Sequence, residues 1–285
     1  MTFSVQLYSV REAFAADPGG TLGRLAEIGF QRVELFDFVS PVRTFGGSAG
    51  PDRTADTFDA SSRVGILEAG LAVAGLQAPS GHAPLITGDV QVVLDAAEQL
   101  GVHYVIDPFL PAEHWQDLDS IKRTADALNA AAQAAEPRGI AVGYHNHAWE
   151  AAPMPDGVTG LEHLAALLEP EVVLEVDTFW AAVGGQDPAA LLQRLADRVQ
   201  LIHLKDGPIS TDVLTQLPVG SGAMDIPAVL RAAATVQIPV VEFDAYAGDI
   251  FEGLAQSLGY LNGTAAVNGT AAVNGTAAVN GTEAS

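Results

Sequence analysis

The feature that most constrains the fold is the regular alternation of short apolar segments with segments that favour a helix. Eight segments are rich in β-branched or aliphatic side chains, namely residues 3–8, 31–36, 72–77, 104–107, 140–145, 172–177, 200–204 and 239–243. Repeated βα units imply a parallel sheet, and eight of them imply that the sheet closes. The sequence therefore predicts an α/β protein with a (β/α)8 TIM barrel. An open, doubly wound sheet is the alternative, but no glycine-rich phosphate-binding sequence follows the first strand.

The segments between the predicted strands have helical spacing. Leu22, Leu25 and Ile28 recur on one helix face, and Gly29 follows them. The predicted helices cover residues 21–28, 60–69, 89–100, 120–135, 159–168, 188–197, a segment after Asp225, and 248–260. Residues 39–56 are rich in Gly, Ser and Pro, which predicts a loop.

The composition changes abruptly at Asn262. The hexapeptide Asn-Gly-Thr-Ala-Ala-Val repeats over residues 262–279, and a further Asn-Gly-Thr follows at 280–282. A β-helix could use such a period, but one large apolar residue per repeat buries too little surface to offset the entropy of ordering the chain. We therefore predict one catalytic domain over residues 1–261 and a disordered, low-complexity tail over residues 262–285.

Composition narrows the class of protein. Hydrophobic residues make up 48% of the 285 residues, which is enough for one large core. There are 35 acidic residues against 13 basic ones, and the resulting net charge of -22 repels nucleic acid. No apolar run approaches the ~20 residues of a membrane span. Nucleic acid and membranes are thus not expected partners, whereas a homo-oligomer is possible.

The chain contains no cysteine, which excludes disulfides and thiolate chemistry. Its first residues form a predicted strand and lack the charged and apolar regions of a signal peptide. From these two features we expect a cytoplasmic protein.

Polar side chains gather at the ends of the later predicted strands. Asp177, His203 and Glu242 each end an aliphatic run, and residues 142–150 read Val-Gly-Tyr-His-Asn-His-Ala-Trp-Glu. Because alternate residues of a strand point to opposite faces, the apolar neighbours of these residues leave the polar ones facing the barrel interior. The residues predicted to face inward are Gln6, Tyr8, Glu34, Gly143, His145, His147, Glu175, Asp177, His203, Lys205, Glu242 and Asp244.

A polar set of this density inside a barrel requires a cation. Buried carboxylates cost several kcal/mol unless they are paired, and Lys205 is the one firmly cationic residue of the inward set. A divalent metal at the carboxyl ends of the strands, bound by Asp177, His203 and Glu242, would resolve the conflict. These ligands suit Mn²⁺, Co²⁺, Zn²⁺ or Mg²⁺. A fourth ligand would come from Glu150, His145 or His147, and the spacing does not choose among them.

At these residues the sequence resembles the xylose isomerase-like sugar phosphate isomerase/epimerase superfamily, over about residues 1–260. The segments that carry the resemblance are Gly29-Phe-Gln-Arg-Val-Glu34, Gly143-Tyr-His-Asn-His147 with Glu150, Glu175-Val-Asp177, His203-Leu-Lys-Asp-Gly207, Gly220-Ser-Gly-Ala-Met-Asp225 and Glu242. The Tyr-His-Asn-His motif is typical of one branch. Other branches carry a Leu-Glu-x-x-Asn motif on the fifth strand, which this sequence lacks.

The resemblance implies a site at the barrel mouth. The implied metal ligands are Glu150, Asp177, His203 and Glu242, with His147 or His145 as the acid/base. The implied cofactor is one divalent ion, Mn²⁺ before Zn²⁺, Co²⁺ or Mg²⁺.

These residues predict an enzyme that removes a proton next to the carbonyl of a sugar. A metal-bound carbonyl acidifies the neighbouring carbon, and imidazole has a suitable pKa for the transfer. We predict His147 as the base and Lys205 as a group that polarises an oxygen. Glu34 and His82 would bind hydroxyls, and Tyr8 and Trp180 would line the pocket.

The function predicted first is therefore a sugar isomerase or epimerase that works through an enediolate. The same intermediate permits a lyase or dehydratase acting on a keto-inositol or a 3-keto-glycoside. A barrel that binds a sugar without catalysis is the second alternative.

Overall fold

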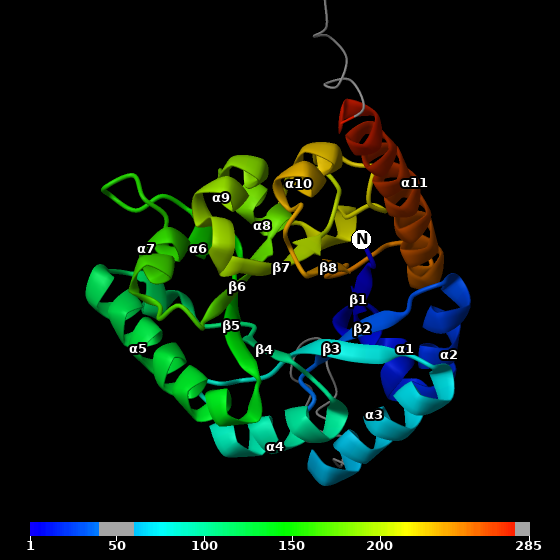
Figure 1. Ribbon diagram of the computed structural model, residues 1–285, viewed down its shortest axis with the longest axis horizontal. Coiled ribbons are helices and arrows are strands. Elements are labelled where there is room, and N and C mark those ends of the chain that lie inside the picture. The colour runs from blue at the N-terminus through cyan, green and yellow to red at the C-terminus, as the bar shows by residue number, and fades with distance from the viewer. Residues whose placement is uncertain (40–59, 277–285) are drawn as a thin grey trace, which may run out of the picture.

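The computed structural model describes residues 1–39 and 60–276, with side chains described for residues 1–39 and 63–264 (Figure 1). Eight parallel strands close into a barrel in the order of the sequence, and β8 pairs with β1. The strands are β1 (Ser4–Gln6), β2 (Arg32–Phe36), β3 (Gln77–His82), β4 (Tyr104–Asp107), β5 (Ala141–His145), β6 (Val173–Asp177), β7 (Val199–Leu204) and β8 (Ile238–Val241). The predicted closed barrel is confirmed.

Helices surround the barrel on the outside, as Figure 1 shows. The α-helices are α1 (Arg11–Ala16), α2 (Pro18–Ile28), α3 (Ala60–Ala74), α4 (Val90–Leu100), α5 (Leu118–Ala135), α6 (Ala148–Ala151), α7 (Gly160–Leu167), α8 (Thr178–Val183), α9 (Pro188–Leu195), α10 (Ile226–Ala232) and α11 (Ile250–Thr276). Short 3-10 helices are η1 (Leu7–Val10), η2 (Ala112–Trp115), η3 (Glu136–Arg138), η4 (Ala196–Arg198) and η5 (Val213–Thr215). The predicted loop at 39–56 lies, apart from Val39, outside the described residues.

Helix ends follow local chemistry. Asp89 precedes α4 and accepts hydrogen bonds from the backbone of Gln91 and Val92, which satisfies amides that have no partner within the helix. Gly101 ends α4 with φ = 70°, a conformation that costs glycine little. Asp225 caps α10 in the same manner, through the amide of Ala228.

The third strand was predicted too early in the chain. Residues 72–74 belong to α3, Gly75 follows that helix at φ = 68°, and β3 runs from Gln77 to His82. Short apolar runs fit a strand or a helix equally well by pattern alone. Here Leu71 is buried as part of α3, so the helix extends and the strand starts later. As a result His82 is the last residue of β3 instead of lying beyond its exit.

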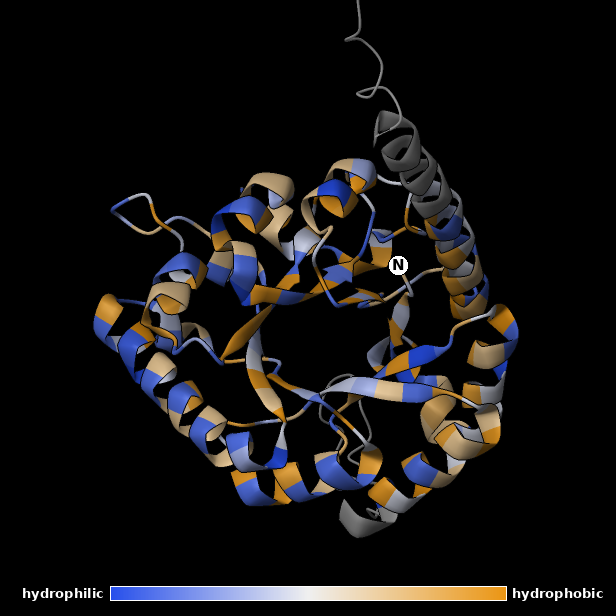
Figure 2. Ribbon diagram, in the orientation of Figure 1, coloured by the Kyte–Doolittle hydropathy of each residue, from blue (hydrophilic) through white to orange (hydrophobic). Residues whose placement is uncertain are grey.

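Apolar side chains form two separate layers, and hydrophobic and hydrophilic residues alternate along the strands in Figure 2. The larger layer packs between strands and helices and includes Leu174, Val176, Ile202 and Leu204. The smaller one fills the barrel interior and consists of Ile106, Val173, Leu201, Ile238 and Val240, with Tyr104 against it. This inner layer precedes the polar residues on the same strands, so it closes the barrel beneath them.

The last helix passes the predicted domain boundary. Helix α11 continues through Asn262, where the repeat begins, to Thr276. Residues 277–285 lie outside the described residues, and the disorder of the tail stays a prediction. The placement of a domain end at residue 261 stays a prediction. None of the helices in the described ranges combines the length and the hydrophobicity needed to cross a membrane.

Candidate active site

Inward-facing polar residues follow the inner apolar layer at the carboxyl ends of β3 and β5 to β8. Glu175 and Asp177 come two and four residues after Val173, and His203 comes two residues after Leu201. The side chains of Glu175, Asp177 and His203 are fully buried. Because alternate residues of a strand face inward, these strands present first apolar and then polar side chains to the barrel interior, as predicted.

Two groups of possible metal ligands form there, and they share two histidines. We call the first the mouth group, which consists of His145, Asp177, His203 and Glu242. We call the second the inner group, which consists of His82, His145, Glu175 and His203. In each group one ligand atom per residue lies within 4.8 Å of all the others, and all members are buried. The donor set of either group can hold a metal ion.

Lys205 neutralises the carboxylates of the mouth group. Its Nζ lies 2.9 Å from Asp177 Oδ2, 2.7 Å from Glu242 Oε2 and 2.8 Å from Asp244 Oδ1. Burial raises the pKa of Asp177 to about 6, although Lys205 opposes this. Burial would raise the pKa of Glu242 too, but Lys205 and His203 hold that pKa well below its usual value. Lys205 therefore lies beside the carboxylates of Asp177 and Glu242, and its role in polarising a substrate oxygen stays a prediction.

The inner group is held by contacts between imidazoles and carboxylates. Glu175 Oε2 lies 2.5 Å from His82 Nε2, 3.1 Å from His145 Nδ1 and 3.3 Å from His203 Nε2. Glu34 joins from β2, with Oε1 2.7 Å from His203 Nε2. Glu34 and His82, predicted to bind substrate hydroxyls, are thus deep in the barrel and in contact with the shared histidines.

His203 connects the two groups. Its Nδ1 lies 2.6 Å from Glu242 Oε2 in the mouth group, and its Nε2 faces Glu34 and Glu175. Burial alone would lower the pKa of His203, but the carboxylates of Glu175, Glu242 and Glu34 raise it well above the usual value. Without a metal, this ring is a cation that offsets the surrounding negative charge.

The structure does not bring Glu150 to the mouth group. Glu150 Oε2 accepts the backbone N–H of His147 in a capping box at the start of α6, and Oε1 accepts the hydroxyl of Tyr144 at 2.8 Å. Burial raises the pKa of Glu150 to about 7. His145 instead occupies the fourth position of the mouth group. Of the alternatives that the sequence left open, the geometry favours His145.

His147 is partly exposed and lies among aromatic side chains. Its side chain is 22% exposed, and its ring stacks on Trp149 with the ring centres 4.7 Å apart. Burial, helped by the positive charge of Lys205, lowers the pKa of His147 to about 3. The imidazole is therefore neutral near pH 7, and its buried Nδ1 has no hydrogen-bond partner.

The two predicted aromatic walls lie in different surroundings. Trp180 is half-buried, and the centre of its ring lies 5.8 Å from Lys205 Nζ and 6.3 Å from the ring centre of His147. Tyr8 packs edge-on against Phe36 and carries the guanidinium of Arg11 over its ring. Trp180 thus lies near Lys205 and His147, whereas Tyr8 contacts Phe36 and Arg11.

Two further residues position the site and were not predicted. Asn146 accepts the backbone N–H of Asp177 at 3.0 Å and donates to the carbonyl of the same residue, so it fixes the end of β6. Its place inside the Tyr-His-Asn-His motif is a signal that could have found it. Gln216 holds Asp244 from the loop after β7, and no local pattern marks it.

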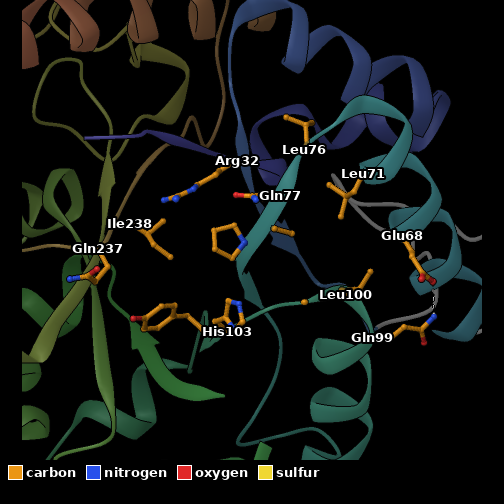
Figure 3. Close-up of a pocket in the computed structure, with 14 residues that line it drawn as sticks. Arg32, Glu68, Leu71, Leu76, Gln77, Gln99, Leu100, His103, Gln237 and Ile238 are labelled. Carbon is orange, nitrogen blue, oxygen red and sulfur yellow. Dashed lines mark hydrogen bonds between the residues drawn. The ribbon is translucent and has the colours of Figure 1, made fainter. Parts of the chain in front are cut away.

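A cavity of about 590 Å³ lies at the opposite end of the barrel, around the starts of the strands. Figure 3 shows Arg32, Gln77, His103 and Ile238 around this space. The inner apolar layer separates it from both groups, since Ile238 belongs to that layer. Chemistry in barrels of this type occurs at the carboxyl ends of the strands, so this cavity is not the candidate active site.

A family model described as xylose isomerase-like TIM barrel matches residues 22–243. The chain belongs to this family. Among curated relatives, an inosose dehydratase of Geobacillus kaustophilus is 36% identical over 106 residues, which are 37% of this chain and 31% of that protein. A 2-epi-5-epi-valiolone 7-phosphate 2-epimerase of Actinoplanes sp. is 34% identical over 156 residues, or 53% of this chain and 54% of that protein. The chain thus matches less than two thirds of the length of these relatives, which are enzymes by name.

Solved structures superimpose on most of the chain. A sugar phosphate isomerase/epimerase from Parabacteroides distasonis superimposes with a TM-score of 0.73 at 24% identity, covering 91% of this chain and 92% of that one. The IOLI protein, whose structure contains a zinc atom, gives a TM-score of 0.67 at 15% identity and covers 93% and 98%. At these identities the likeness establishes the fold alone.

Proposed function

We propose that this chain is a divalent-metal-dependent enzyme that removes a proton next to the carbonyl of a sugar or keto-sugar and so isomerises or epimerises it. The observation that carries the proposal is the mouth group, where two imidazoles and two carboxylates converge at the carboxyl ends of β5 to β8. This end of the barrel is where the fold places its chemistry. The epimerase among the curated relatives supports this class of reaction.

The ligand types of the mouth group fit a divalent ion of borderline hardness, for which we propose Mn²⁺. Asp177, His203, Glu242 and His145 would hold it. Bound there, the ion would supply Lewis acidity toward the oxygens of the substrate. Neither the identity of the metal nor the ligand set follows from the family alone.

The protein's own groups supply the proton transfer in this proposal. We assign proton removal from a substrate carbon to His147, whose imidazole is neutral and 22% exposed and lies near Trp180. Its Nδ1 is buried near Glu150 Oε1, so the accepting atom would be Nε2. Lys205 remains charged because Asp177, Asp244 and Glu242 surround it, and its ammonium group would donate a hydrogen bond to a substrate oxygen that takes the place of one of these carboxylates. Trp180 and Trp149 flank this space with flat apolar surfaces.

Exchange of hydrogen with solvent tests the proposal without knowledge of the product. Ketoses, keto-inositols and 3-keto-glycosides are incubated with the full chain and Mn²⁺ in D₂O, and deuterium at the carbon next to the carbonyl is measured by NMR. We expect exchange on at least one substrate and its loss in chelator. Metal-independent exchange, or binding of a substrate without any exchange, would contradict the proposal.

Dehydration is the second candidate because an inosose dehydratase is among the curated relatives. It begins with the same proton removal and ends with loss of a β-hydroxyl group. The same NMR experiment detects it as an unsaturated product from a keto-inositol. A sugar-binding barrel without catalysis would bind such compounds and leave them unchanged. The cytoplasmic location and a homo-oligomeric state stay predictions from the sequence.

A further inference from the structure

The inner group lies deeper than the mouth group and has a different donor set. Three imidazoles, from His82, His145 and His203, surround the carboxylate of Glu175, whereas the mouth group has two imidazoles and two carboxylates. His82 is 4% exposed and the other three are at most 3% exposed. Nitrogen-rich sets of this kind favour zinc, and oxygen-rich sets favour manganese and magnesium.

Without a metal, histidines are the ion-pair partners of the inner carboxylates in the described part of the chain. Glu34 and Glu175 are fully buried, and their ion pairs in the described part of the chain are all with histidines. Glu34 Oε2 and Glu175 Oε1 are buried without a hydrogen-bond partner. Lys205, by contrast, serves the mouth group. Buried carboxylate oxygens without donors are costly, and a metal ion would offset this cost.

Two of the three separations between Glu175 Oε2 and the imidazole nitrogens match those of tetrahedral zinc. Ligand atoms at about 2.0–2.1 Å from such an ion lie roughly 3.3 Å apart. Glu175 Oε2 is 3.1 Å from His145 Nδ1 and 3.3 Å from His203 Nε2. The 2.5 Å separation from His82 Nε2 would have to open by roughly 0.8 Å for zinc to bind.

We propose that the inner group is a zinc site, and that zinc bound there excludes the metal of the mouth group. A neutral imidazole has one nitrogen that can ligate, while the other carries a proton. His203 turns Nε2 inward and Nδ1 toward Glu242, and His145 turns Nδ1 inward and Nε2 toward Asp177. Each of these two rings can therefore ligate a metal ion in only one of the two groups at a time.

Zinc in the inner group would leave the mouth group with Asp177, Glu242 and the ammonium of Lys205. When His203 ligates through Nε2, its Nδ1–H donates to Glu242, a carboxylate–histidine–metal arrangement that orients the ring. Zinc is thus an inhibitor of binding at the mouth group. The inhibitory role depends on the proposed function, whereas the zinc site does not.

Two reciprocal variants of the full chain test the inference with each ion alone and in competition. Zn²⁺ affinity is measured against a chromophoric chelator, and Mn²⁺ affinity by the EPR signal of the free ion. His82→Gln should weaken Zn²⁺ binding about 10-fold or more and leave Mn²⁺ affinity within about threefold, because His82 belongs to the inner group alone. Asp177→Asn should do the reverse. His103→Gln, an exposed histidine at the other end of the barrel, is the matched control and should change neither.

In each variant, unchanged affinity for the other ion also shows that the variant folds. In the wild-type chain, Zn²⁺ should displace Mn²⁺ with one ion bound in total. The inference is overturned if both ions bind together, or if His82→Gln weakens both ions equally or neither. Failure of Mn²⁺-dependent exchange, with the Zn²⁺ results intact, would reject the proposed function and leave the zinc site standing.

Discussion

His145 and Glu150 belong to one short segment of the chain, yet only His145 belongs to the mouth group. His145 is the last residue of β5 and faces inward between Glu175 and Asp177. Glu150 turns back to cap α6 and to accept the hydroxyl of Tyr144. Both side chains are ionisable and buried, so they differ only in the direction in which they point and in the residues that they contact.

Substitutions on this segment separate a ligand from a base. We expect His145→Gln to lose Mn²⁺ affinity and Glu150→Gln to keep it within a few-fold. His147→Gln should keep the metal and lose about 10²–10⁴-fold in turnover, because a base acts only in the transition state. Elemental analysis and exchange kinetics on the same preparations measure both properties. If Glu150→Gln loses the metal and His145→Gln retains it, the ligand set implied by the family resemblance is the right one.

The raised pKa of Glu150 predicts a pH dependence of stability in the metal-free chain. Its pKa is about 7 in the folded protein against 4.5 for an unperturbed glutamate side chain, so the folded state binds the proton more tightly. The contribution is fully present below about pH 4.5 and is lost as pH rises toward 7; the shift corresponds to on the order of 3 kcal/mol. Urea unfolding between pH 5.5 and 8 should show a steeper decline for wild type than for Glu150→Gln. Equal slopes for the wild-type and Glu150→Gln proteins would contradict the assignment of this pH dependence to Glu150.

At the level of elements, β5 approaches its neighbours so closely that one inward position has no room for a side chain. A Cβ at Gly143 would lie 2.6 Å from Ile106 Cδ1 and 2.8 Å from the carbonyl oxygen of Val173. The second of these atoms belongs to the backbone of β6, so it cannot rotate away. Gly143 therefore sets the distance between β5 and β6, which carry His145, Glu175 and Asp177.

Gly143→Ala should destabilise the barrel by about 1–3 kcal/mol through overpacking. Gly259→Ala is the matched control: this position in α11 is exposed, and a Cβ added there would meet no atom within 4 Å, so alanine should be neutral or add up to about 1 kcal/mol. Chemical denaturation measures both. A Gly143→Ala protein as stable as wild type would show that β5 and β6 adjust freely.

The last helix has a buried part and a repetitive part. Leu254, Leu258 and Leu261 are buried against the barrel, whereas Asn262 and Gly263 are exposed. Removal of residues 263–285 should leave the melting temperature and activity unchanged. Removal of residues 254–285 should cost several kcal/mol, because it deletes three buried leucines. A loss of several degrees from the shorter truncation would mean that the repeat packs on the domain or mediates assembly.

At the scale of the whole molecule, both the negative net charge and the buried carboxylates favour the binding of a cation. The net charge is -22, and four of the acidic residues that contribute to it lie close together in the barrel interior, namely Glu34, Glu175, Asp177 and Glu242. Protonated histidines and Lys205 offset part of this charge. A divalent ion would offset more, and it would bind the folded state only, since the ligands come from separate strands.

Metal binding should therefore raise the melting temperature. An ion at 100 times its dissociation constant stabilises the folded state by about 2.7 kcal/mol. For a chain of this size that corresponds to a rise of several degrees. Calorimetry of chelator-treated protein with and without Mn²⁺ measures it, with Asp177→Asn expected to show a smaller rise. An unchanged melting temperature in saturating metal would contradict metal binding by the folded barrel.

The sequence by itself determined the features that depend on local periodicity. The period of two along each strand assigned Glu175, Asp177, His203 and Glu242 to the barrel interior, because their apolar neighbours had to meet the helix layer. The alternation of strands and helices likewise sufficed for a closed parallel barrel. These conclusions need no knowledge of which residues from distant strands meet.

Tertiary structure decided the rest. The start of β3, and with it the inward position of His82, depended on how far α3 packs before Gly75, which a short apolar run does not encode. The direction of the Glu150 carboxylate, away from the mouth group, depended on the hydroxyl of Tyr144 and the backbone N–H of His147, from which it accepts hydrogen bonds. The sharing of His145 and His203 between two ligand groups requires the actual distances across β3, β5, β6, β7 and β8. Such distances arise from closure of the whole barrel, so no segment of the sequence contains them.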